Sequence, residues 1–244
     1  MPGHVSSIIV PDYDQSAGTA TCVNEKHESM GQVISVPPNH WYTSFTFDTD
    51  DLNNATITCG DLQLRYRILT KQSSGSFRGS VTSIFRNHRS VRQWDVLVAE
   101  WERHTYSTDR IRMAPDLEYN AEVASVSMNK FLPAVAPWSE DKSTFRASNG
   151  KRYIWKEQAR TVMLYSKEFK RLPLAMLSQI NLSRPGPMHI KLSRECEDIL
   201  DEVLVTCLIA ESKRRWRERI SSYANIALAA ASATNAAASA AASC

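Results

Sequence analysis

The sequence predicts a mainly β protein in which about a dozen short antiparallel strands surround one hydrophobic helix. Segments rich in β-branched and aromatic residues recur every 8–15 residues between residues 41 and 192, with turn signals between them. This spacing is typical of an antiparallel barrel or sandwich. One apolar run without a charged residue, residues 203–210, follows the strand-like segments.

The apolar run is predicted to form a helix enclosed by sheet. Acidic residues precede it and basic residues follow it, an order that suits the helix dipole. At about 100° per residue its apolar side chains point all round the axis, so such a helix has to be enclosed. The β-branched residues in the run also fit a strand, but the flanking charges and the length favour a helix over about 195–219, with Ser193 as its N-cap.

The strand-like segments can be followed in order along the chain. Residues 62–70 show the clearest alternation, because Leu62, Leu64, Tyr66 and Ile68 face one way while the polar residues between them face the other. The turn signal at residues 148–150, Ser-Asn-Gly, separates two later segments. The predicted strands are residues 41–47, 55–59, 62–70, 80–86, 91–101, 111–113, 122–128, 130–132, 144–147, 151–156, 161–165, 174–177 and 188–192.

The predicted organisation is one domain between two low-complexity ends. The 244 residues are enough for a large all-β domain with a real core. Residues 1–38 are expected to be a flexible arm, residues 39–220 the domain, and residues 221–244 an Ala-rich tail that is disordered or weakly helical. Neither a secretory signal nor an apolar membrane span is recognised, so an intracellular location, cytoplasmic or peripheral to a membrane, is expected. The five cysteines are then expected to be free thiols.

Several segments, in this order, resemble a fungal family of unknown function found in mushroom-forming fungi. They are SVTSIFR (80–86), VLVAEW (96–101), NKFLP (129–133), TFRASNGKRYIWK (144–156), VMLYS (162–166), PLAML (173–177) and ILDEVLVTCLIAESKRR (199–215). The resemblance covers roughly residues 41–216. It implies a tubby-like fold, shared with phospholipid scramblases, in which a closed antiparallel β-barrel of about twelve strands surrounds a hydrophobic C-terminal helix. The wider superfamily recurrently binds anionic phospholipid, but the resemblance supplies no catalytic residue.

Basic residues are the candidate ligand-binding residues. A run at the end of the predicted helix also contains Trp216, and such a cluster could hold an anionic membrane surface. A pair on the polar face of the third strand-like segment could add to it. The alternative is a solvated helix end and an Arg-rich exposed strand face, which need no ligand. The candidates are Lys213, Arg214, Arg215, Arg217, Arg219, Arg65 and Arg67.

Three functional hypotheses follow from these patterns. The first is a non-enzymatic binding module that recognises anionic phospholipid, which basic residues gathered on one face would favour. The second is a protein-interaction or structural scaffold, which an exposed apolar patch with scattered charges would favour. The third, an enzyme with a Cys–His pair such as Cys59 and His88, is the weakest, because no catalytic motif, metal-ligand spacing or cofactor loop is present. No cofactor and no nucleic-acid partner are expected.

Overall fold

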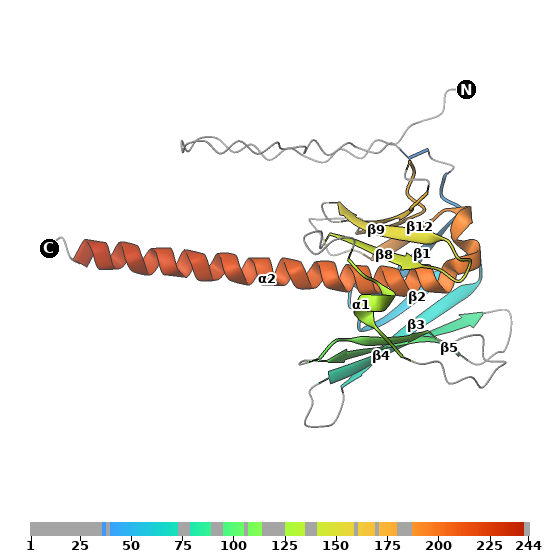
Figure 1. Cartoon of the computed structure of the whole chain (residues 1–244), viewed down its shortest axis with the longest axis horizontal. Helices are drawn as coiled ribbons and strands as arrows, with labels where there is room; N and C mark the ends of the chain where they lie inside the picture. Colours follow the sequence, from blue (N-terminus) through green and yellow to red (C-terminus); the bar gives the residue numbers. More distant parts are fainter. Residues whose placement is uncertain are drawn as a thin grey trace.

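The described part of the chain forms one twelve-stranded antiparallel sheet and a long C-terminal helix (Figure 1). The computed structural model describes residues 36–37, 40–72, 79–88, 95–104, 107–113, 125–134, 141–158, 161–168, 171–179 and 187–241, without the side chains of 88, 179 and 228–241. The strands are β1 (Thr43–Phe47), β2 (Asn54–Cys59), β3 (Leu64–Gln72), β4 (Gly79–His88), β5 (Val96–His104), β6 (Arg110–Met113), β7 (Val126–Ser127), β8 (Lys142–Arg146), β9 (Arg152–Gln158), β10 (Thr161–Ser166), β11 (Ala175–Gln179) and β12 (Met188–Leu192). The helices are α1 (Met128–Phe131), the 3₁₀ helix η2 (Arg194–Ile199) and α2 (Leu200–Ala241).

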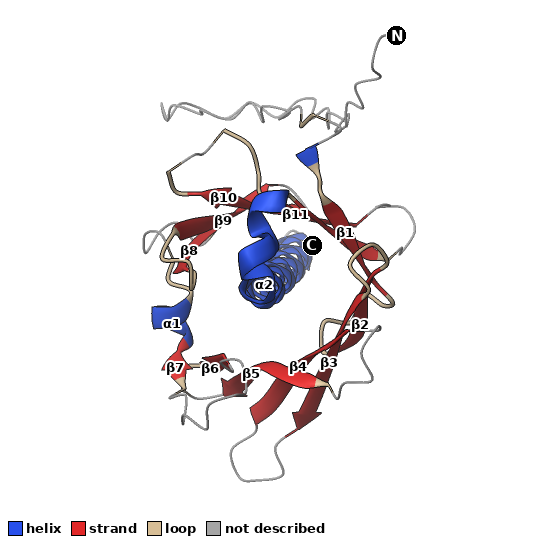
Figure 2. Cartoon of the chain, turned by 90° about the vertical axis from the view of Figure 1, so that its right-hand side faces the viewer, coloured by secondary structure: helices blue, strands red, loops and turns tan. Residues whose placement is uncertain are grey.

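Sequential antiparallel pairing builds the sheet in two runs. Strands β1 to β7 are neighbours in chain order, and so are β8 to β12. The ladder between β1 and β12, in which Phe45 lies opposite Ile190, joins the two runs. The continuous sheet curves around α2, so that strands lie on all sides of the helix when it is viewed end on (Figure 2).

The predicted closed barrel needs correction, because the sheet does not close. Its strand order begins at β7 and ends at β8, and no ladder between these two edges is found in the described residues. Strand β7 has only two residues, which pair with β6, and it leads directly into α1. Contact between the edges comes instead from the chain after α1: Ala134 forms an isolated bridge with Ser143, and the Thr144 amide donates to the Pro133 carbonyl at 2.9 Å.

Side-chain alternation along the strands gives the sheet an apolar concave face and a polar convex face. On β3, Tyr66 and Ile68 are fully buried, whereas Arg65 and Arg67, which alternate with them, are exposed. The alternation predicted for residues 62–70 is therefore confirmed. Residues from the inward faces of the other strands, such as Phe45 and Trp155, belong to the same core cluster as the helix.

The enclosed helix is also confirmed. Every residue from 203 to 211 is buried, and the exposed fraction of Leu204 is 0%. The hydroxyl of Thr206 donates to the Glu202 carbonyl at 2.7 Å and accepts the indole N–H of Trp155 on β9 at 2.9 Å. The one hydroxyl of the buried run therefore both donates and accepts a hydrogen bond, as buried polar groups generally do.

Helix α2 is longer than the sequence predicts. The helix expected to end near residue 219 continues to Ala241, so the tail that was expected to be disordered or weakly helical is helical as far as that residue. Alanine has the highest intrinsic helix propensity, and no proline follows to stop the helix. The C-terminal part of α2 extends well beyond the sheet (Figure 1).

Two local predictions also need correction. The strand expected at residues 130–132 is not formed, because α1 spans Met128–Phe131. Ser193 precedes η2 with an extended backbone but makes no side-chain capping hydrogen bond, so the helical segment begins without the predicted hydroxyl cap. The strand expected at residues 91–101 is formed from Val96, while residues 91–94 and nearly all of the N-terminal arm, residues 1–35, lie outside the described residues.

Two carboxylates in the first turn of α2 attach the helix to the sheet. Asp201 accepts the Tyr66 hydroxyl at 2.6 Å and the Arg86 guanidinium at 2.6 Å. Glu202 accepts the backbone N–H of Ser148 at 2.8 Å and the Ser148 hydroxyl at 3.1 Å. Acidic side chains at this end also complement the positive end of the helix dipole, so the same groups orient the helix and stabilise its start.

Replacing a core leucine of α2 should destabilise the protein far more than replacing an exposed apolar residue of the same helix. We expect Leu204→Ala to lower the free energy of unfolding by about 2–5 kcal/mol, because the enclosed site cannot collapse around the lost atoms. Ile226→Ala is the control, since Ile226 is 66% exposed. Urea denaturation of both variants measures the difference, and equal losses would contradict enclosure.

Stability should fall in alkaline solution. Burial raises the pKa of Tyr66 above its usual 10.0, and the neighbouring Asp201 raises it further. Burial likewise raises the pKa of Cys196 from 9.0 to about 12 and that of Cys207 well above 9.0. In each case the unfolded chain loses its proton first, so stability is complete below about pH 9 and declines as the pH rises through the unfolded values.

The tyrosine part of this decline can be isolated by removing its hydroxyl. We expect Tyr66→Phe to make the loss of unfolding free energy above pH 10 shallower, because one group with a raised pKa is gone. Tyr223→Phe, at a side chain that is 70% exposed, should leave the slope unchanged. Urea denaturation at a series of alkaline pH values tests both, and identical slopes for Tyr66→Phe and the parent would refute the assignment.

Candidate functional site

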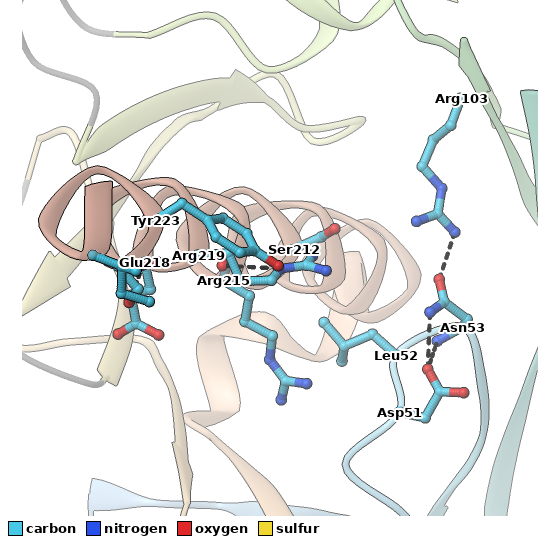
Figure 3. Close-up of a pocket in the computed structure, with 11 residues that line it drawn as sticks. Asp51, Leu52, Asn53, Arg103, Ser212, Arg215, Glu218, Arg219 and Tyr223 are labelled. Carbon is cyan, nitrogen blue, oxygen red and sulfur yellow. Dashed lines mark hydrogen bonds between the residues drawn. The ribbon is translucent and has the colours of Figure 1, made fainter. Parts of the chain in front are cut away.

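A pocket of about 730 Å³ lies where α2 leaves the sheet (Figure 3). One wall is the helix, and the opposite wall is formed by the β1–β2 loop and the end of β5. This volume lies in the range of small-molecule sites. The lining residues are Asp51, Leu52, Asn53, Arg103, Ser212, Arg215, Glu218, Arg219, Ser222, Tyr223 and Ile226.

Arg103 organises the sheet side of the pocket. Its Nη2 donates to Asn53 Oδ1 and to Thr82 Oγ1, both at 2.7 Å. Its guanidinium lies over the Trp101 ring, 4.7 Å from the centroid, a cation–π arrangement. Partial burial lowers the pKa of Arg103, and the more distant Asp109 and Asp51 only partly oppose this effect. The guanidinium is therefore a partly desolvated cation held by neutral oxygens.

The β1–β2 loop forms a rigid edge next to Arg103. Asp51 Oδ1 accepts the backbone N–H of Asn53 and its side-chain amide, both at 2.9 Å. This local turn leaves Asn53 Oδ1 free to accept from Arg103, as the chain of dashed lines in Figure 3 shows. Short polar side chains that bond their own backbone are typical of such turns.

On the helix side, a buried ion pair lies just above the apolar core. Glu211 accepts two hydrogen bonds from Arg214, with Nε–Oε2 at 2.7 Å and Nη2–Oε1 at 2.8 Å. The exposed fractions of the two side chains are only 3% and 8%. Arg214 also pairs with Glu218, and these carboxylates raise the pKa of Arg214 despite its burial. Buried guanidinium charge here is thus matched by carboxylates.

The structure places most of the predicted basic run in contacts within the protein. Arg215 donates to Glu211 at 2.7 Å and to the Asp50 carbonyl at 2.6 Å. Arg217 pairs with Glu157 on β9, and Lys213 Nζ donates to the Leu132 carbonyl at 3.3 Å. These side chains fasten α2 to the rim of the sheet, a role that the charge pattern alone did not indicate.

Arg219 differs from the other helix cations. It is exposed, and its hydrogen bond is to the Arg215 carbonyl on its own helix, at 3.4 Å. No carboxylate lies within ion-pair distance of it among the residues described. Of the five predicted helix cations, Arg219 therefore has the guanidinium most available to a ligand.

Arg65 and Arg67 are not brought together with the helix cations. Both lie on the convex face of β3, because Tyr66 and Ile68 occupy the concave face toward α2. Arg67 forms an ion pair with Asp95 and lies over the Phe85 ring. The predicted basic set therefore divides between the inside and the outside of the sheet.

Large apolar side chains are exposed on the emerging part of α2. Trp216, Ile220 and Tyr223 are 59%, 45% and 70% exposed. Their spacing of four and three residues puts them on one face of the helix, and Ile226 follows three residues later at 66% exposed. Four of the seven large apolar residues that are exposed in the described chain lie on this stretch, so the surface of α2 changes from enclosed core to exposed apolar stripe within two turns.

Chemistry-bearing residues do not gather elsewhere in the described structure. Among the described residues, no three His, Cys, Asp or Glu side chains lie close enough together to share a metal ion. Cys59, Cys196 and Cys207 are buried free thiols, as expected, and Cys59 contacts the Thr43 hydroxyl at 3.0 Å. The His88 side chain of the hypothetical Cys–His pair lies outside the described residues. Within the part described, no helix is long and apolar enough to cross a membrane.

Sequence reasoning missed Arg103, Asp51 and Asn53 as pocket residues. A signal for Arg103 was present, because it follows Ala99 and Trp101 at alternate positions and therefore faces inward on β5. An arginine at an inward position needs polar partners. The approach of the β1–β2 loop to β5 carries no comparable signal, since it depends on the curvature of the whole sheet.

Comparison with known proteins gives one family. A model described as "Family of unknown function (DUF6593)" matches residues 50–216, which span strands β2 to β12 and the enclosed part of α2. No curated protein and no solved structure matches the chain.

Removing the buried carboxylate of α2 should be costly. We expect Glu211→Ala to lower the free energy of unfolding by about 3–5 kcal/mol, because Arg214 then stays buried with its main partner removed. Glu218→Ala is a matched control at the same arginine: the Glu218 side chain is 54% exposed, and exposed pairs contribute about 0–1 kcal/mol. Urea denaturation measures both, and similar losses would show that the buried pair is not special.

Proposed function

Because the chain belongs to the DUF6593 family, whose function is unknown, we propose a function from the geometry of the helix exit. The protein is a non-enzymatic interaction module, and the sheet holds α2 so that its emerging part is presented to a partner protein. The exposed stripe of Trp216, Ile220 and Tyr223 carries this proposal. Exposed apolar clusters of this kind are typical of interaction sites.

The partner surface is expected to be an apolar, uncharged groove that accepts a helix. Residues 220–244 contain no charged residue, so a charged partner face would be desolvated without compensation. Hydrophobic grooves that bind a helix contact apolar side chains spaced three or four residues apart along it. The hydrogen bond of Arg215 to the Asp50 carbonyl and the ion pair of Arg217 with Glu157 attach the helix to the rim of the sheet. These contacts support a fixed presentation of the helix, which reduces the entropy cost of binding.

Recognition of anionic phospholipid through the basic residues is the alternative proposal. Its support is Arg219, which has no ion-pair partner among the described residues, and an aromatic residue on the same helix turn, Trp216. Against it, Arg214, Arg215 and Arg217 are each matched by a carboxylate of the protein. The apolar stripe is therefore favoured over the basic run as the binding surface.

We further propose that the domain is a variant of the tubby-like fold in a fungal family. The support is the central hydrophobic helix surrounded by twelve antiparallel strands, with neighbours in chain order. The bridge between Ala134 and Ser143 then takes the place of the last ladder of a closed barrel.

The interaction surface can be tested with a double substitution in the stripe. A partner captured by the parent chain should bind again when both proteins are purified, and Trp216→Ser with Ile220→Ser should weaken that binding by about 30-fold or more, as expected for a central apolar anchor. The control is Tyr42→Ser with Leu172→Ser, at residues that are 41% and 37% exposed away from the helix.

Two further measurements distinguish the other occupants of the stripe. Sedimentation equilibrium of the parent and the double variant shows whether the stripe instead binds a second copy of the chain. Co-sedimentation with phosphatidylcholine vesicles, with and without phosphatidylserine, tests the membrane alternative. Binding of the purified partner that is equal for the parent and for Trp216→Ser with Ile220→Ser would rule out the proposed surface.

A further inference from the structure

The pocket beside α2 contains a guanidinium that no carboxylate neutralises by direct contact. Arg103 Nη2 donates to the neutral oxygens of Asn53, Thr82 and, at 3.5 Å, Thr70, and its buried Nε has no hydrogen-bond partner among the described residues. Among the described residues, no carboxylate oxygen lies within ion-pair distance of this group. A partly buried cation is stabilised by an anionic partner. An anion bound next to Arg103 at the pocket wall would therefore gain a favourable interaction.

A second available cation lies on the helix wall of the same pocket. Arg219 is exposed, and its hydrogen bond to the Arg215 carbonyl uses only Nε. Figure 3 shows Arg103 and the helix residues on opposite walls of the pocket. An anion between these walls would therefore meet guanidinium groups that come from two separate elements of the fold.

The charges that line the pocket sum to one positive charge. Three arginines, Arg103, Arg215 and Arg219, oppose two carboxylates, Asp51 and Glu218. The pairing of Arg214 with Glu211 and Glu218 adds one charge of each sign and leaves the sum unchanged. Both lining carboxylates already accept hydrogen bonds from the protein, Asp51 from Asn53 and Glu218 from Arg214. The groups left to a ligand are thus mainly donors.

The pocket also offers apolar surface next to these donors. Leu52 projects from the β1–β2 loop, and Tyr223 and Ile226 line the helix wall. Sites for organic ligands typically combine such apolar walls with a few polar groups that fix orientation. A simple inorganic anion would leave this surface unused.

We propose that the pocket binds a small organic anion, a phosphate monoester or carboxylate attached to an apolar or aromatic group, between Arg103 and Arg219. The anionic group accepts from both guanidiniums, and the apolar group lies against Tyr223 and Ile226. Such an anion can be a soluble metabolite or the headgroup of a lipid. The site shares Tyr223 with the apolar stripe but does not include Trp216 and Ile220, so the contacts of the anion with Arg103 and Arg219 do not require that these two residues bind a protein.

Isothermal titration calorimetry with phenyl phosphate tests the proposal on the full chain. We expect saturable binding of phenyl phosphate, weaker binding of inorganic phosphate and no binding of phenol up to about 10 mM, a concentration that reveals even millimolar affinity. Arg219→Gln should weaken binding about five- to tenfold by removing a charge-assisted contact. Arg65→Gln, on the convex face of β3, is the matched control and should bind like the parent.

A second experiment distinguishes a soluble anion from a lipid headgroup as the ligand. Co-sedimentation with phosphatidylcholine vesicles, with and without phosphatidic acid, shows whether a lipid phosphate enters the pocket, and this binding should likewise weaken in Arg219→Gln. Arg103→Lys is a second probe that keeps the charge but loses the planar donor set. The proposal is overturned if neither phenyl phosphate nor phosphatidic acid vesicles bind, or if binding is the same in the parent and in Arg219→Gln. Folding of each variant is checked by its thermal melt.

Discussion

The enclosure of nine consecutive helical residues by the sheet is the constraint on which the rest of the structure depends. Residues 203–211 are buried on every side, so the concave face of the sheet has to supply apolar contacts all round the helix. A curved sheet of twelve strands meets this need even though its edges, β7 and β8, share no ladder in the described residues. Both runs of strands, β1 to β7 and β8 to β12, pack against α2. This shared core holds the two runs together where the ladder between their edges is missing.

The charges at both ends of the buried run fix the helix along its axis. At the start, Asp201 is held by Tyr66 and Arg86 of the sheet. At the exit, Arg215 donates to the Asp50 carbonyl and Arg217 pairs with Glu157 on the sheet, while Glu211 pairs with Arg214 and Arg215 within the helix. Most cations of the basic run, which suggested a lipid-binding surface in the sequence, are therefore used in contacts that hold the helix in place. The proposed functions rest on groups that take no part in these contacts.

Those groups lie on two adjoining surfaces of the helix exit. The apolar stripe that begins at Trp216 is exposed although residues 203–211 of the same helix are buried. In the adjoining pocket, the guanidiniums of Arg103 and Arg219 contact no carboxylate of the described residues. A helix that carries both surfaces would offer a protein partner and a small anion adjoining sites that share Tyr223.

The sequence by itself determined the strand-rich class, the inward and outward faces of β3 and the enclosed helix, because side-chain periodicity and a charge-free run are local properties. It also indicated the Ser-Asn-Gly turn, where Gly150 has a φ of 78°. Only the tertiary structure decided that the sheet stays open, that Arg217 meets Glu157, and that Arg103 and the β1–β2 loop form a pocket with α2. These features depend on contacts between residues far apart in the chain, and local patterns cannot specify which distant partner a charge will meet.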